Sequence, residues 1–152
     1  MTHVRFEPYA PACNAACLAL FDRNCPAFFA PRERSDYADF LTTVDGSYQV
    51  VLADEAVIAA FGVALVAPQR ARLRWIVIDP AWQGRGIGRA MMDAATEAAR
   101  ALGATALEIA ASHKSAPFFA RFGAQTVAFV RDGWGADMHR VDMQLPVDAE
   151  RA

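Results

Sequence analysis

Hydrophobic residues form continuous runs in some segments of the chain and recur every three or four residues in others. The clearest strand pattern is the apolar, β-branched run at residues 73–78, which is typical of a strand buried in the middle of a sheet. Asp79 and Pro80 end this strand, because proline has no N–H to donate to a sheet. At residues 89–102 the period becomes helical, and Gly103 stands where a helix commonly ends.

The rest of the chain follows the same two periods, with turns such as Asp54-Glu55 between the segments. The predicted strands are residues 4–8, 47–53, 56–66, 73–78, 104–111, 125–131 and 138–145, and the predicted helices are residues 12–24, 33–44, 89–102 and 115–122. The order is β-α-α-β-β-β-α-β-α-β-β, which indicates an α/β protein of the α+β kind. At 152 residues we expect one domain, residues 1–146, followed by a polar tail, residues 147–152.

The turn between the central strand and its helix carries the most informative chemistry. Gly84, Gly86 and Gly88 alternate with other residues there, and glycine lets a backbone adopt positive φ and approach a ligand closely. The free N–H groups of the first helical turn and the helix dipole then favour an anion. Arg85 and Arg89 add positive charge, so the sequence predicts a site for a pyrophosphate.

The spacing distinguishes this turn from two common nucleotide sites. No Gly-Lys-Ser/Thr follows, as a P-loop requires, and the glycines do not have the G-x-G-x-x-G spacing of a dinucleotide fingerprint. Gln83, Gly86 and Gly88 instead match Gln/Arg-x-x-Gly-x-Gly/Ala, which resembles the acetyl-CoA signature of the GNAT superfamily of N-acetyltransferases. Residues 116–124 resemble the helix that packs beside the pantetheine arm in that family.

The resemblance covers essentially the whole chain and implies a GNAT fold, a mixed central sheet of about seven strands flanked by about four helices. It implies acetyl-CoA as co-substrate and direct attack of a primary amine on the thioester. The pantetheine would pair with the strand before the glycine turn, and the pyrophosphate would lie on the turn. The residues that would bind acetyl-CoA are Ile76, Val77, Ile78, Gln83, Gly84, Arg85, Gly86, Ile87, Gly88, Arg89 and Phe119.

Two usual catalytic helpers are missing. Arg72 stands where many family members have a glutamate, and Phe119 where they have a tyrosine. A lysine-like amine has a pKa of ~10.4, so its deprotonation at pH 7 costs about 4–5 kcal/mol, and the proton needs a route out. The substitutes are His113 and His139, our catalytic candidates, and also Asp137 and Asp142 near the last strand, each against the simpler interpretation of a surface side chain.

Three aromatic residues lie in predicted loops and are candidates for the substrate pocket. They are Phe28, Phe29 and Trp134. Loop aromatics also serve as subunit contacts or cover a core, and both alternatives remain open. The last two strands and the Trp134 loop resemble regions that pair subunits in the family, which suggests a homodimer.

Composition narrows the possible partners. The chain is 55% hydrophobic and 21% charged with a net charge of −2, so it has no basic surplus for a nucleic acid. No apolar run approaches the roughly 18 residues of a membrane span, and the first residues do not resemble a signal peptide, so we expect a cytoplasmic protein without membrane contact. Cys13, Cys17 and Cys25 lack zinc-site spacing, so we predict no metal and no disulfide framework.

Three functions fit these observations. We predict an enzyme, an acyltransferase that moves an acetyl group from acetyl-CoA to a primary amine of a small molecule or peptide. The alternative is a GNAT-fold protein that binds CoA, has weak or lost catalysis and serves a regulatory role, which the residues Arg72 and Phe119 motivate. A nucleotide-binding domain of another kind rests only on the glycine turn.

Overall fold

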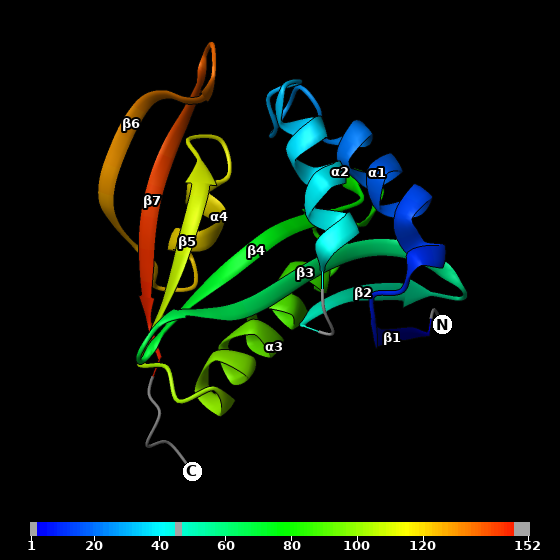
Figure 1. The fold of residues 1–152 in the computed structure, drawn as a ribbon, viewed down its shortest axis with the longest axis horizontal. Coiled ribbons are helices and arrows are strands. Elements are labelled where there is room, and N and C mark those ends of the chain that lie inside the picture. Colours follow the sequence, from blue (N-terminus) through cyan, green and yellow to red (C-terminus); the bar gives the residue numbers. More distant parts are fainter. Residues whose placement is uncertain (1–2, 45–46, 148–152) are drawn as a thin grey trace.

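Seven strands form one mixed sheet in the order β1-β2-β3-β4-β5-β7-β6 (Figure 1). The computed structural model describes residues 3–44 and 47–147. The strands are β1 (Val4–Pro8), β2 (Tyr48–Ala53), β3 (Ala56–Ala67), β4 (Arg70–Ile78), β5 (Ala106–Ser112), β6 (Gln125–Gly135) and β7 (Met138–Pro146), and the helices are α1 (Asn14–Arg23), α2 (Glu33–Thr43), α3 (Ile87–Ala101) and α4 (Ala116–Ala120), with short 3-10 helices η1 (Pro11–Cys13) and η2 (Pro80–Trp82). The predicted order of elements and the mixed sheet of seven strands with four α-helices are confirmed for the described residues.

The helices divide the core into two layers. Helix α3 packs on one face of β3 and β4, where its buried side chains join Val51, Leu73 and Leu107. Helices α1 and α2 cover the opposite face, where Leu20 and Tyr37 are fully buried. No helix among residues 3–44 and 47–147 is long and apolar enough to cross a membrane.

Several boundaries differ from the sequence prediction, two of them near the end of the chain. We expected residues 132–137 to be a loop, but β6 continues to Gly135 and only a tight turn at Asp137 (φ 60°) separates it from β7. We placed Val147 at the start of the tail, but it is buried and its N–H donates to the Thr105 carbonyl at 2.8 Å. The rest of the predicted tail, residues 148–152, lies outside the described residues.

Strand β4 contains an irregularity that the sequence did not predict. Ala60 and Gly62 of β3 pair with Val77 and Arg74, so β4 has one extra residue between these two pairs. Trp75 absorbs it in a left-handed conformation with φ 42°, which is rare for a bulky residue. The bulge reverses the alternation of side chains along the strand. Leu73 faces α3 before it, whereas Val77 faces α1 and α2 after it.

A pair of buried tyrosines holds this bulge. The Tyr48 hydroxyl donates to the Trp75 carbonyl at 2.6 Å, and the hydroxyls of Tyr48 and Tyr37 are 2.8 Å apart. The Tyr37 ring also lies against Trp75, with centroids 4.9 Å apart. Gly62 stands opposite Tyr48, and a side chain there would come within 2.8 Å of the tyrosine ring.

We therefore expect Tyr48→Phe to lower the free energy of unfolding by about 1–3 kcal/mol, because it leaves the Trp75 carbonyl without its buried donor. Tyr9→Phe is the matched control, since the half-exposed Tyr9 hydroxyl accepts only a 3.3 Å hydrogen bond from Asn14. Urea denaturation of both variants tests this difference. Equal losses for the two would show that the Tyr48 hydroxyl does not anchor the bulge.

Candidate active site

The site begins where two neighbouring parallel strands separate. Strands β4 and β5 pair at only three positions, the last being Arg72 with Glu108, and then diverge (Figure 1). Residues 73–78 of β4 therefore have no β5 partner along that edge. A cavity of about 1370 Å³ opens between the strands and continues toward α1 and α2, which is larger than the roughly 300–1,000 Å³ of an ordinary small-molecule pocket.

The glycine turn lies at one end of this cavity. Gly84 and Gly86 have φ of 77° and 83°, which glycine adopts without strain, and Gly86 caps α3. Helix α3 begins at Ile87, two residues before the predicted start, so its first N–H groups belong to the glycine turn itself. A smaller hollow of about 340 Å³ adjoins the turn and includes Arg89.

Close packing explains the third glycine. A Cβ on Gly88 would lie within 2.8 Å of the Phe118 ring, so only glycine lets α4 approach the start of α3. Phe118 in turn packs edge-on against Phe122, with centroids 5.1 Å apart. The two segments that carried the family resemblance are therefore in direct contact.

The structure brings most of the predicted site residues together. The large cavity is lined by Ile76, Val77, Ile78, Gln83, Gly84, Gly88 and Phe119 of the predicted acetyl-CoA set and by Phe28, Phe29 and Trp134 of the predicted substrate set. Gly86 and Arg89 line the smaller hollow. Ile87 is buried in the core and the Arg85 guanidinium lies 4.6 Å from the centre of the Trp82 ring, so neither side chain lines the cavities.

Both predicted catalytic histidines lie elsewhere. His113 and His139 line neither cavity, and their rings face each other with centroids 4.7 Å apart. Nδ1 of His113 accepts a hydrogen bond from the His139 backbone N–H at 3.1 Å, and Nδ1 of His139 accepts one from the Asp132 N–H at 2.9 Å. The first bond joins the residue after β5 to the start of β7, and the second joins β7 to β6. The geometry therefore supports a structural role for both rings, and the catalytic role expected from the sequence stays a prediction.

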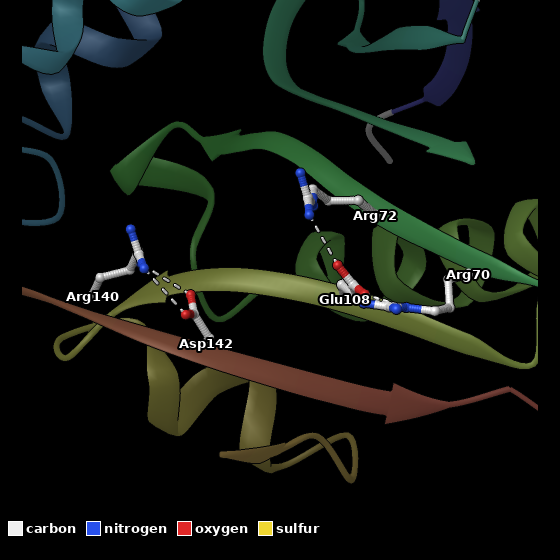
Figure 2. Close-up of polar contacts among 5 residues, drawn as sticks. All are labelled: Arg70, Arg72, Glu108, Arg140 and Asp142. Atoms are coloured by element: carbon white, nitrogen blue, oxygen red, sulfur yellow. Dashed lines mark hydrogen bonds and ion pairs between the residues drawn. The ribbon is translucent and has the colours of Figure 1, made fainter. Parts of the chain in front are cut away.

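Paired charges form the floor of the cavity where β4, β5 and β7 lie side by side (Figure 2). Glu108 accepts hydrogen bonds from Arg70 Nε at 2.6 Å and from Arg72 Nη2 at 3.0 Å. Burial raises the pKa of the Glu108 carboxyl, but the two arginines outweigh this effect and the pKa lies below its ordinary value. Glu108 is thus held as a carboxylate and is a poor proton acceptor.

A second pair lies beside it on β7. The Arg140 Nε atom is 3.0 Å from Asp142 Oδ1, and Nη2 is 3.4 Å from Oδ2 (Figure 2). The Nε–H is not aimed at the carboxylate, so this buried atom has no hydrogen bond among the described residues. The floor thus offers guanidinium groups, each already beside a carboxylate.

Aromatic side chains close the cavity on the side of α1 and α2. The Phe29 ring stacks on the Phe21 ring, with centroids 4.9 Å apart, and lies near the Trp75 ring, with centroids 6.2 Å apart. Trp134, which we expected in a loop, ends β6 and donates its indole N–H to the Ala111 carbonyl at 2.9 Å. Arg32 Nε donates to the Trp134 carbonyl at 2.7 Å, so the segment between α1 and α2 meets the end of β6 above the cavity.

Sequence reasoning missed one buried acid in this wall. Glu33, the first residue of α2, lines the cavity, yet only 5% of it is exposed. It stands between Arg32 and Arg34 at a helix start, which in sequence resembles an ordinary exposed first turn. Burial raises its pKa to about 7. No pattern in the sequence points to this burial, since it depends on how the segment before α2 folds against β6.

Comparison with known families agrees with this geometry. Residues 17–124 match the model of the acetyltransferase (GNAT) family, a stretch that includes the splayed strands and the glycine turn. The chain belongs to this family. This GNAT protein is thus an acyltransferase by family. A search of curated proteins finds no match to it.

Solved structures share the fold of this GNAT protein at low identity. A GNAT-family protein from Desulfovibrio desulfuricans is 21% identical with a TM-score of 0.78, over 96% of this chain and 100% of that one. The ribosomal-protein-S18-alanine N-acetyltransferase of Escherichia coli is 17% identical with a TM-score of 0.77, over 96% and 95%. A Salmonella typhimurium protein solved with acetyl-CoA is 16% identical with a TM-score of 0.73, over 98% and 96%.

The position of His113 leads to a test. We expect His113→Asn, whose side-chain oxygen replaces Nδ1 as the acceptor for the His139 N–H, to keep kcat within about threefold of the parent, whereas removal of a general base costs about 10²–10⁴-fold. The measurement is thiol release from acetyl-CoA with an accepted amine. A loss of a hundredfold with normal folding would return His113 to the catalytic candidates.

Proposed function

We propose that this protein is an acetyl-CoA-dependent N-acetyltransferase that acetylates a primary amine of a small molecule or peptide. The observation that carries the proposal is the continuous cavity from the glycine turn at the start of α3 to the splay between β4 and β5. One end suits an anion, the middle offers a free strand edge, and the far end is polar and lined by aromatic side chains. These three environments, taken in order along the cavity, fit the long acetyl-CoA thioester followed by the acceptor amine.

The residues present fit acetyl-CoA at each of these places. Backbone N–H groups between Gln83 and Arg89 would hold the pyrophosphate, because they are free of intrahelical partners and lie at the positive end of the α3 dipole. The unpaired edge of β4 from Ile76 to Ile78 would hydrogen-bond the amide groups of the pantetheine. Phe119, buried at 3% exposure, would form part of the wall beside the arm.

Acetyl-CoA supplies an activated acetyl group, and the protein supplies position and a route for protons. Anchoring both reactants in one cavity makes the attack effectively intramolecular, which accounts for a large part of the rate in such reactions. The Phe28 and Phe29 side chains and Trp134 would exclude water around the amine. Two residues of the site do not carry protons. Arg72 is bound to Glu108, and Phe119 has no ionisable group.

An assay of thiol release over a panel of amines tests this function. Transfer to at least one amine supports an enzyme, whereas tight acetyl-CoA binding with no transfer to any amine would favour the regulatory alternative. Failure to bind acetyl-CoA would overturn both. We also propose that the protein acts in the cytoplasm, where Cys13, Cys17 and Cys25, all unpaired in the structure, would stay reduced.

Gly86 gives a direct test of the anion site. A side chain there meets no other atom within 4 Å, and Asn and Asp tolerate its positive φ better than other residues. We expect Gly86→Asp to weaken acetyl-CoA binding by about tenfold or more, or ~1.4 kcal/mol, because a carboxylate enters the site of the pyrophosphate. Gly86→Asn, the uncharged control, should bind within about threefold of the parent by isothermal titration, and equal losses in both variants would argue against this site.

We also propose that the protein forms a homodimer through the outer edge of β6. Val127 and Phe129 on this edge strand are 62% and 57% exposed, and an apolar edge of this kind is commonly covered by a partner.

We expect a dimer by sedimentation at tens of micromolar, a range in which a modest interface persists, and Phe129→Lys should shift it to monomer. Leu65→Lys is the control, because Leu65 is also exposed but lies on β3. A monomeric parent protein, or equal effects of the two lysines, would contradict the β6 interface.

A further inference from the structure

We propose that Glu33 is the general base that removes the proton from the acceptor amine. This inference rests on the proposed N-acetyltransfer. It assigns a residue to the removal of the amine proton, a step for which Arg72 and Phe119 are unsuited. The inference begins from the placement of the carboxyl group in the cavity wall.

Helix α2 places Glu33 next to the bulge of β4. Tyr37 lies one helical turn further along the same face of α2, and its ring packs on Trp75. Phe29 precedes Glu33 by four residues and also contacts Trp75. Phe29, Glu33 and Trp75 all line the cavity where β4 and β5 diverge. Glu33 thus lines the cavity from α2, on the face of the sheet where Tyr37 and Trp75 pack.

Only one oxygen of this carboxyl has a structural partner. Glu33 Oε2 accepts a hydrogen bond from the Ala30 backbone N–H at 2.8 Å, which fixes the side chain against the segment before α2. Within the described part of the chain no other hydrogen bond reaches the carboxyl. Oε1 therefore has no hydrogen-bond partner there, and it is not fully enclosed by other atoms. This oxygen is thus not used by a hydrogen bond of the fold, and Glu33 lines the cavity.

The environment suits proton transfer at neutral pH. Burial is the main cause that raises the pKa of Glu33 to about 7, with a smaller increase from Asp36, whereas the Ala30 N–H and Arg32 lower it. Cys25, in the loop after α1, also interacts with this carboxylate. A pKa near the working pH leaves about half of the group ready to accept a proton, which is the condition for effective general base catalysis.

The other acids of the cavity are less suited to this role. The Glu108 carboxylate is paired with Arg70 and Arg72, which keep its pKa below the ordinary value. Asp142 lies beside Arg140, and both are on the floor strand β7. Glu33 has no arginine or lysine bound to its carboxyl among the described residues, so it keeps the basicity that its burial confers.

The proton balance is as follows. The acceptor arrives as an ammonium ion, and Glu33 Oε1 takes one proton from it, directly or through one water, and later releases this proton to solvent. The amine lone pair then forms the C–N bond to the acetyl carbon while the C–S bond breaks and its electron pair stays on sulfur. The second proton lost by the nitrogen ends on that sulfur, giving an amide and a free thiol.

The deciding variant is Glu33→Gln, because its side-chain oxygen can still accept the Ala30 N–H hydrogen bond while the basic group is lost. We expect kcat to fall by about 10²–10⁴-fold with acetyl-CoA affinity unchanged, and the rise of parent kcat with pH through about 7 to disappear. Asp39→Asn, an exposed acid on the same helix that is not among the groups that shift the pKa of Glu33, should retain both the rate and the pH profile.

The outcomes separate this proposal from the proposed function. If the parent acetylates an amine and Glu33→Gln keeps its rate and pH profile, Glu33 is only a helix cap and the base assignment is overturned. If the parent binds acetyl-CoA but acetylates no amine, the proposed function fails and the role of Glu33 fails with it. A partial loss of rate in Glu33→Gln, with the pH dependence of kcat unchanged from the parent, would also count against Glu33 as the base.

Stability provides a readout that does not depend on activity. A carboxyl whose folded pKa is about 7 and whose unfolded value is 4.5 stabilises the fold fully below pH 4.5, and this contribution is lost as the pH rises through 7. Glutamine has no such dependence. The Tm of Glu33→Gln should therefore increase relative to the parent between pH 5 and pH 8, and a constant difference would show that the carboxyl is not perturbed as proposed.

Discussion

The hydrogen bond from the Tyr48 hydroxyl to the Trp75 carbonyl is the contact on which the site depends. It holds one extra residue of β4 in a left-handed conformation, at the place where β4 leaves β5. Without the bulge, the strand would keep its alternation and present the other set of side chains to α1 and α2. The buried tyrosine pair of β2 and α2 therefore determines which β4 groups face the cavity.

The same constraint links the two halves of the site. The α2 face that carries Tyr37 also carries Glu33, so the helix that supports the bulge presents the buried carboxyl beside it. At the other end of β4, the Asn24 side chain donates to the Ile78 carbonyl at 3.0 Å and ties α1 to the strand just before the glycine turn. Both helices on this face thus set the path of β4 between the acetyl-CoA end and the acceptor end.

The sequence allowed the order of elements, the central strand and the glycine turn to be predicted, because these depend on local periodicity and on residues with special backbone preferences. It did not allow the bulge at Trp75 to be predicted, since that conformation depends on a hydrogen bond from a residue 27 positions away. Trp134 was assigned to a loop because glycines surround it, yet pairing with β7 extends the strand. A position after β5 likewise does not reveal that the His113 ring packs on His139 instead of lining the cavity.

The energy of deprotonation shows what the aromatic wall contributes to Glu33. Moving a proton from an amine of pKa ~10.4 to a carboxylate of pKa about 7 costs about 4–5 kcal/mol, nearly the cost of releasing it to water at pH 7. A base of this strength therefore gains little from equilibrium alone. Burial beside Phe28 and Phe29 lowers the pKa of an ammonium while it raises that of the carboxyl. Each unit by which the two values converge removes about 1.4 kcal/mol from the transfer, so the apolar wall and the base act together.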